Sequence, residues 1–288
     1  MHSSRIQKLE CALYVVATPI GNMRDISLRA LDVLSSADTI AAEDTRNSAH
    51  LLTHHGINAK RLLALHQHNE RGAADKVIGL LAQGRSVALI TDAGTPAVSD
   101  PGALVVEAVR AAGYRVIPIP GANAAVAALS AAGLATPHFL FFGFLPNKSA
   151  ARSKELQTLA EHQYTLVFYE APHRILECVA DLQTVFGDER QIVLAREVTK
   201  LFESIHRCRL GDALDWLNSD PNNLRGEFVL LVSAAPERAE GLSAEAEHVL
   251  SILLIELPLK QAVQIAVQIT GLGRNELYQR ALAMKATE

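Results

Sequence analysis

The sequence has few of the residues that build disulfide scaffolds and zinc sites. Its three cysteines, Cys11, Cys178 and Cys208, lie far apart and show no C-x-x-C spacing. A disulfide framework or a cysteine-based zinc site is therefore not expected, and a reducing cytoplasm is the simplest compartment. His66 and His68 alternate at the end of a predicted strand. Without a nearby cysteine we interpret them as polar wall residues of a site, and we predict no metal.

The chain also lacks an excess of either charge and any long apolar segment. Its formal net charge is -4, so nucleic-acid binding would need a local basic patch rather than a generally basic surface. The apolar stretch that follows the polar residues 1–10 is broken by Pro19 and makes a poor signal peptide. Residues 122–135 are rich in small apolar side chains, but they are too few to span a membrane. We expect a buried helix there and no membrane contact.

Predicted strands and helices alternate through the first half of the chain. The strands are expected at residues 13–18, 39–42, 62–65, 86–91 and 115–119, and the helices at residues 27–36, 46–55, 73–81 and 103–112. This alternation predicts a mostly parallel sheet covered by helices, which is an α/β fold. We assign residues 12–121 to this N-terminal domain.

The second half has more strands in succession and fewer helices. The strands are expected at residues 138–144, 164–169, 191–196, 201–208 and 227–233, and the helices at residues 149–159, 173–185 and 212–217. This order predicts a mixed sheet in a second, α+β domain, which we place at residues 122–235. Residues 236–288 form a small helical tail, in which a Gly-Leu-Gly turn separates two predicted helices in the manner of a helix-turn-helix. Nucleic-acid contact and simple packing both remain open for this tail, because its second helix has few cations.

Residues 91–102, TDAGTPAVSDPG, form the most informative segment of the chain. They follow a buried strand, and ligands bind at the carboxyl ends of such strands in open α/β sheets. Two glycines allow close backbone approach, and Asp92 and Asp100 offer acceptors to a polar or cationic ligand. The segment matches neither the dinucleotide fingerprint nor the P-loop. A purely structural turn, with Ser99 or Asp100 as the helix N-cap, is equally compatible with the sequence.

Four other polar turns follow predicted strands, at residues 18–22, 43–46, 66–70 and 118–123. All five turns would face the same edge of a parallel sheet, where polar groups gathered together indicate a site.

The motifs as a set resemble one known family. They are, in chain order, ATPIGN, EDTR, HQHNE, TDAGTPAVSDPG, PIPGAN, FFGFLP, FYEAPHR, AREVTK and RGEFVLLV. Their order and spacing over roughly residues 12–235 are similar to those of the tetrapyrrole-methylase-like (class III) S-adenosylmethionine methyltransferases. Within that superfamily the motifs look most like those of bacterial enzymes that methylate a cytidine ribose 2'-oxygen in the decoding centre of 16S rRNA.

The resemblance implies two domains with S-adenosylmethionine in the cleft between them, a 16S rRNA or small-subunit substrate and a homodimer. The cofactor-binding residues it implies are Pro19, Asp92, Ala93, Gly94, Val98, Ser99, Asn123, Ala124, Phe142, Tyr169, Glu170, Ala171 and Arg196.

The ribose 2'-hydroxyl would need a base, for which Asp25, Asp44, His66 and Glu70 are candidates. We favour Asp44 with Arg46 and Glu70 as the substrate-side, catalytic groups. The alternative for Asp44 and Arg46 is a local ion pair at a helix N-terminus.

Binding RNA requires positive charge, and the second domain has cations that would form a basic rim facing the cleft. The predicted RNA-binding residues are Lys148, Arg152, Lys154 and Arg174. Ordinary solvated charge is the alternative for the segment from Lys148 to Lys154.

Three other functions stay open: methylation of a tetrapyrrole, methylation of a protein side chain, and a non-catalytic RNA-binding module that keeps the pocket as a sensor. Thr95-Pro96, where tetrapyrrole-specific relatives often have a Gly-Asp-Pro turn, argues against the first.

Overall fold

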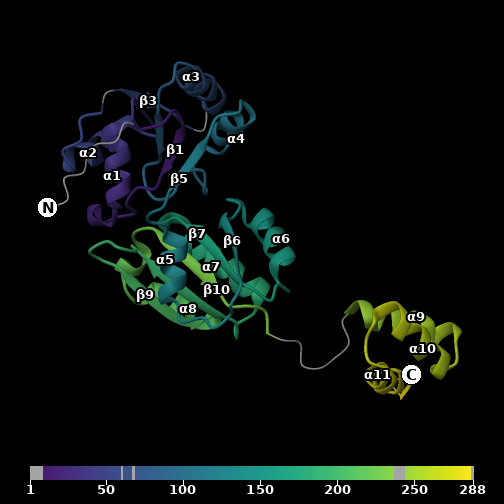
Figure 1. The fold of residues 1–288 in the computed structure, drawn as a ribbon. Coiled ribbons are helices and arrows are strands. Elements are labelled where there is room, and N and C mark those ends of the chain that lie inside the picture. The colour runs from purple at the N-terminus through teal and green to yellow at the C-terminus, as the bar shows by residue number, and fades with distance from the viewer. Residues whose placement is uncertain (1–8, 60, 67–68, 237–243, 287–288) are drawn as a thin grey trace. The chain divides into compact units, whose positions relative to one another are not determined.

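A computed structural model describes residues 9–59, 61–66, 69–236 and 244–286 (Figure 1). The chain divides into two compact units, Met1–Ala235 and Pro236–Glu288.

The first sheet of the larger unit is parallel throughout. Its strands are β1 (Leu13–Val16), β2 (Thr39–Ala42), β3 (Leu62–Ala64), β4 (Val87–Ile90) and β5 (Val116–Ile119), in the order β3-β2-β4-β1-β5. The helices are α1 (Leu28–Ser36), α2 (Thr45–His54), α3 (Glu70–Ala82) and α4 (Ala103–Ala111). β2 and β4 are buried along their whole length, as expected of apolar strands covered on both faces. The predicted α/β fold with a parallel N-terminal sheet is confirmed.

Two helix starts decide between alternatives that the sequence left open. The Ser27 hydroxyl accepts the backbone N–H of Ala30 and caps α1. The N-cap of α4 is Gly102, with φ of 126°, and no side chain caps this helix. The alternative in which Ser99 or Asp100 caps α4 is therefore wrong.

The second sheet is mixed, as predicted. Its strands are β6 (Phe139–Phe144), β7 (Thr165–Glu170), β8 (Gln191–Arg196), β9 (Ser204–Arg209) and β10 (Phe228–Val232), in the order β6-β7-β10-β8-β9. Among the strand pairs of this sheet in the described residues, only β6–β7 is parallel, and the other pairs are antiparallel.

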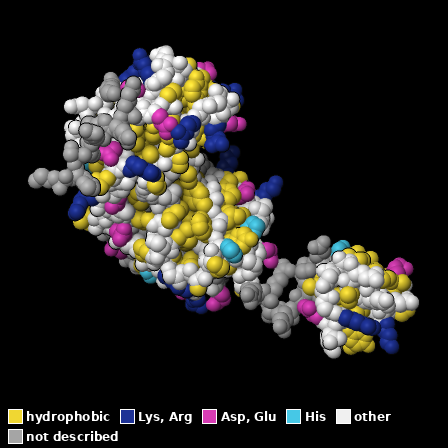
Figure 2. Space-filling view, in the orientation of Figure 1, with side chains coloured by type: hydrophobic (Ala, Val, Ile, Leu, Met, Phe, Trp, Pro, Cys, Tyr) yellow, Lys and Arg dark blue, Asp and Glu magenta, His cyan; other side chains and the backbone are white. Residues whose placement is uncertain are grey.

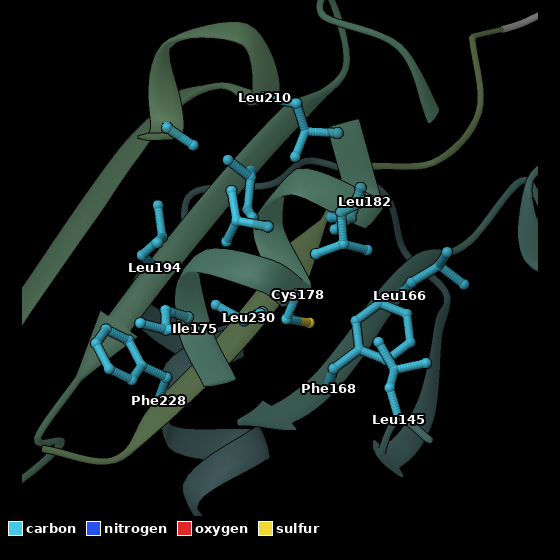
Figure 3. Packing of buried hydrophobic residues seen from close by; sticks show 14 of the residues in the cluster. Leu145, Leu166, Phe168, Ile175, Cys178, Leu182, Leu194, Leu210, Phe228 and Leu230 are labelled. Atoms are coloured by element: carbon cyan, nitrogen blue, oxygen red, sulfur yellow. The ribbon is translucent and has the colours of Figure 1, made fainter. Parts of the chain in front are cut away.

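Helices cover both faces of this sheet. The helices α6 (Ser149–Leu159), α7 (Ile175–Phe186) and α8 (Leu210–Ser219) pack on one face over a core that includes Phe168, Cys178 and Leu230 (Figure 3). The small-residue helix α5 (Ala124–Ala131) packs on the opposite face through Ala125 and Ala128. It is the buried helix that the sequence predicted in place of a membrane span. Within the described part of the chain, no helix combines the length and apolar character that crossing a membrane requires.

The smaller unit is a three-helix cluster of α9 (Ala244–Glu256), α10 (Leu259–Thr270) and α11 (Arg274–Ala286). Its core includes Leu250, Val263 and Leu277. α10 ends at Gly271, whose left-handed conformation allows the sharp turn into α11.

Arg152 of α6 is buried in the larger unit, with a side-chain exposure of 0%. Its Nε donates to Asp181 of α7 at 2.6 Å, and Glu177 of the same helix lies 3.8 Å from another of its nitrogens. Arg152 thus joins two helices under the second sheet. The prediction that it belongs to an RNA-facing rim is wrong, because its guanidinium is enclosed by protein.

Replacing Arg152 by alanine should destabilise the larger unit by about 3–5 kcal/mol, because it leaves Asp181 without its buried cation. Lys154→Ala, on the exposed face of the same helix, should change the free energy of unfolding by less than about 0.5 kcal/mol. Urea unfolding followed by the fluorescence of Trp216, the single tryptophan, measures both. Equal unfolding midpoints for the two variants would contradict the structural role of Arg152.

Candidate active site

A pocket of about 220 Å³ opens between the two sheets of the larger unit. The loops after β1, β4 and β5 line one side, and residues at the ends of β6, β7, β8 and β10 line the other. β1 and β4 are neighbours, yet the chain leaves them toward opposite edges of the sheet. The pocket therefore lies at the switch point of the parallel sheet, where α/β folds bind ligands.

The loop after β4, residues 91–102, is tied to the neighbouring loops by backbone bonds. Thr18 and Gly94 exchange two such bonds, of 2.8 and 3.1 Å, and the Thr95 hydroxyl donates to the Ala122 carbonyl at 3.2 Å. Ala97 and Ser99 have φ of 66° and 63°, which side chains other than glycine rarely adopt. Such strained residues collect where a fixed loop shape serves binding or catalysis.

The second sheet approaches this loop at Gly143 of β6. A Cβ at this position would lie 2.6 Å from the Ser99 Oγ, and the φ of Gly143 is 83°. Glycine is therefore required here on two grounds, backbone conformation and space.

An irregularity in β6 decides which phenylalanine faces the pocket. The pairing of β6 with β7 shifts register between Phe141 and Gly143. Beyond the shift Phe144 lines the pocket and contacts the Tyr169 ring, with 5.7 Å between centroids. Phe142 packs against Phe168 in the core instead. The resemblance assigned Phe142 to the cofactor site, whereas Phe144 is the aromatic residue of β6 that lines the pocket.

Most of the predicted cofactor residues come together in this pocket. Those that line it are Ala93, Gly94, Val98, Ser99, Asn123, Ala124, Tyr169, Glu170 and Ala171. The backbone N–H of Ala125, at the start of α5, donates to the Tyr169 hydroxyl at 3.2 Å, which fixes that ring.

Three other predicted cofactor residues are not among the lining residues. Pro19 does not line the pocket, whereas its neighbour Ile20 does. Asp92 is turned toward α2, where it accepts the backbone N–H of Asp44 at 3.1 Å. Arg196 donates to the Ser204 hydroxyl at 3.1 Å.

Several lining residues were not predicted from the sequence. They include Ile20, Phe144, Lys200, Glu227 and Phe228, whereas Asp100 was expected as an acceptor for a ligand. Each belongs to one of the nine motifs that carry the family resemblance. The motifs therefore pointed to these segments, but the sequence did not show which of their side chains face the pocket. Lys200 lies 2.8 Å from both Glu197 and Glu227 and neutralises them at the mouth of the pocket.

The three residues predicted as catalytic lie outside the pocket lining. Asp44 caps α2 and pairs with Arg46 at 2.8 Å, an arrangement that holds the pKa of Asp44 at about 2. This is the local ion pair at a helix start that the sequence left as the alternative, and so acidic a carboxylate is a poor base near neutral pH. Glu70 accepts the backbone N–H of Gly102 and thereby joins the start of α3 to the loop after β4.

The other base candidates add nothing to the pocket. Asp25 and His66 are not among the residues that line it. His68 lies outside the described residues.

The predicted RNA-facing cations divide into two kinds. Lys148 and Lys154 are exposed, and for them RNA contact stays a prediction. Arg174 pairs with the buried Glu170 at 3.1 Å and donates to the Leu145 carbonyl at 2.8 Å. Arg174 thus neutralises a carboxylate of the pocket wall, and RNA contact by its partly exposed side chain stays a prediction.

Comparisons with known proteins agree along almost the whole chain. The model of tetrapyrrole (corrin/porphyrin) methylases matches residues 12–214, and that of the RsmI C-terminal HTH domain matches residues 240–285. The ribosomal RNA small subunit methyltransferase I of Pseudomonas aeruginosa is 54% identical over 272 residues, covering 94% of this chain and 96% of its own length. The protein of that name from Escherichia coli O157:H7 is 48% identical over 270 residues, covering 94% of both chains.

Solved structures show the same fold at low identity. A cobalt precorrin-4 methyltransferase is similar with a TM-score of 0.59 at 18% identity, covering 77% of this chain and 95% of its own. The uroporphyrin-III C-methyltransferase from Thermus thermophilus, complexed with S-adenosylhomocysteine, has a TM-score of 0.54 at 16% identity, covering 77% and 97%.

Replacing Gly143 by alanine should weaken the binding of S-adenosylmethionine at least about tenfold, because the new methyl displaces Ser99 in the pocket wall. Gly113→Ala is a matched control: its φ of 82° imposes the same backbone strain, but no atom lies within 4 Å of the new Cβ. Isothermal titration calorimetry compares the two affinities. If both variants bind as the wild type does, the Gly143–Ser99 contact does not shape the site.

Proposed function

The chain belongs to the tetrapyrrole methylase family, and we propose that it transfers a methyl group from S-adenosylmethionine to the RNA of the small ribosomal subunit. The observation that carries the proposal is the identity of 54% and 48% to two proteins named as methyltransferases of that RNA, over nearly the full length of each. A pocket at the switch point of the parallel sheet, lined by the family's motifs, supports it.

We further propose a cytidine ribose 2'-oxygen of 16S rRNA as the acceptor. This finer assignment rests on the motif set, whose order and spacing resemble those of the enzymes with that specificity. Transfer to a hydroxyl is an in-line displacement, so holding the acceptor close to the methyl group supplies much of the rate.

The residues proposed to hold S-adenosylmethionine are those of the predicted set that line the pocket. The Ala93–Gly94 backbone allows close approach, and Asn123 at the start of α5 offers an amide. The rings of Tyr169 and Phe144 provide apolar surface beside them. A sulfonium is cationic, and Asp100 and the neighbouring carbonyls supply the electronegative surroundings that suit it.

A small tetrapyrrole acceptor has less support. The structures of tetrapyrrole methyltransferases share the fold at 18% identity or less for the two described above, which says nothing of the substrate. Thr95 and Pro96 also stand where those enzymes often have a Gly-Asp-Pro turn.

Incubation with tritiated S-adenosylmethionine and small subunits from cells that lack the modification should label one cytidine ribose. Large ribosomal subunits serve as the matched control and should stay unlabelled. Digestion of the RNA to nucleosides and mapping of the label identify the site. Saturable cofactor binding without transfer to RNA would contradict the proposed substrate and favour a small-molecule or protein acceptor, or a sensor.

We also propose a homodimer that acts in the cytoplasm, where its ribosomal substrate is. Apolar side chains cover much of the visible face of the larger unit (Figure 2). Leu28, Leu201 and Phe202 are exposed by 81%, 89% and 67%, and a subunit interface would bury apolar side chains such as these. Size-exclusion chromatography with light scattering should give the mass of two chains at micromolar concentration. The mass of a single chain would contradict the dimer.

A further inference from the structure

Asp100 is a half-buried carboxylate in the wall of the pocket. It lies on the loop after β4, three residues ahead of α4. Because the side chain of Asp100 does not cap α4, it is available to the pocket.

The other two carboxylates of the pocket lining are already neutralised. Glu170 is paired with Arg174 at 3.1 Å, and it also accepts the Ala171 backbone N–H at 2.8 Å. Glu227 is paired with Lys200 at 2.8 Å. Among the residues that the structure describes, no arginine or lysine forms an ion pair with Asp100.

The groups that face Asp100 come from three elements and are mostly acidic. Glu43, after β2, and Asp92, after β4, repel its negative charge, and the Thr91 side chain lies beside it. Tyr169 of β7 faces it from the second sheet. Burial, together with Glu43 and Asp92, raises the pKa of Asp100 to about 6. Burial and the charge of Asp100 raise the pKa of Tyr169, which keeps that phenol neutral.

Two of these neighbours are committed to other contacts. The Thr91 hydroxyl donates to Glu43 at 2.6 Å, and Asp92 accepts the Asn47 side-chain amide at 2.9 Å. Of these three carboxylates, Asp100 is also the one that lines the pocket, so it is the one placed to accept a proton from a bound molecule.

We propose that Asp100 is the general base of the reaction, taking the proton of the ribose 2'-hydroxyl. This inference rests on the proposed function. As the 2'-oxygen forms a bond to the methyl carbon, the carbon–sulfur bond breaks and its electron pair stays on sulfur, giving S-adenosylhomocysteine. The O–H electron pair stays on the ribose oxygen, and the proton moves to Asp100. Partial exposure of Asp100 lets the carboxylic acid release that proton to water afterwards.

The assignment has a defined pH signature. The carboxylate is the active form, so the transfer rate should fall as the pH drops through the Asp100 pKa of about 6 and level off above it. Asp100→Asn should lower the single-turnover rate at pH 8 by about 100-fold or more and remove this bend. Its affinity for S-adenosylmethionine should fall by much less than the transfer rate does, because the amide keeps the shape of the side chain and removes only the charge beside the sulfonium.

The experiment measures single-turnover transfer to small ribosomal subunits between about pH 5.5 and 8.5, with titration calorimetry for cofactor affinity. Asp100→Glu should recover part of the rate and keep the bend. Glu107→Gln, an exposed carboxylate on α4, is the matched control and should behave as the wild type does. Unfolding midpoints check that each variant is folded.

Three results would overturn the assignment of Asp100 alone. They are a wild-type rate for Asp100→Asn, a bend near pH 6 that persists in that variant, and a loss of rate matched by an equal loss of cofactor affinity. No transfer to RNA by the wild-type protein would instead overturn the proposed function, and this assignment with it.

Discussion

The pair of backbone hydrogen bonds between Thr18 and Gly94 holds together the two loops on which the site depends. Thr18 is buried, and its hydroxyl donates to the Thr91 carbonyl at 3.1 Å, so the loop after β1 is attached to the loop after β4 at two points. The positive φ values of Ala97 and Ser99 carry a cost of order 1–3 kcal/mol each, which isolated loops would relax. Hydrogen bonds to the end of the neighbouring strand β1 stabilise this one conformation of the loop after β4.

The second sheet completes the site by coming very close to that loop. Gly143 permits the approach to Ser99, and the register shift beside it turns Phe144 toward the pocket. The irregularity in β6 therefore serves two purposes. It places a residue without a side chain, Gly143, at the close approach to Ser99, and it directs the Phe144 ring into the pocket. The Gly143→Ala variant tests the first of these purposes and leaves the Phe144 ring unaltered.

The fold could be predicted from the sequence because its strands are short apolar runs bounded by turn residues. Observed strand ends lie within a few residues of the expected ones. β9 starts later, at Ser204, because a turn closed by the Glu203 N–H on the Lys200 carbonyl at 3.1 Å precedes it. Side-chain directions were less predictable. Arg152 looks like a surface cation in sequence, and its burial depends on Asp181, 29 residues away. Asp100 faces Glu43 only because β2 and β4 are neighbours, which the order of the chain does not reveal.

The electrostatics of the pocket follow from how its acids are divided. Glu170 and Glu227 are neutralised by Arg174 and Lys200, which leaves the cluster around Asp100 as the local source of negative potential. A like-charged cluster opposes folding, and such clusters persist mainly where function uses them. A cationic sulfonium beside the cluster would favour the carboxylate form of Asp100, which is the form that takes the proton. Transfer of the methyl group removes that positive charge, so the proton affinity of Asp100 rises as the acceptor hydroxyl becomes acidic. The same acids that favour binding of the sulfonium thus favour capture of the proton once the sulfonium is gone.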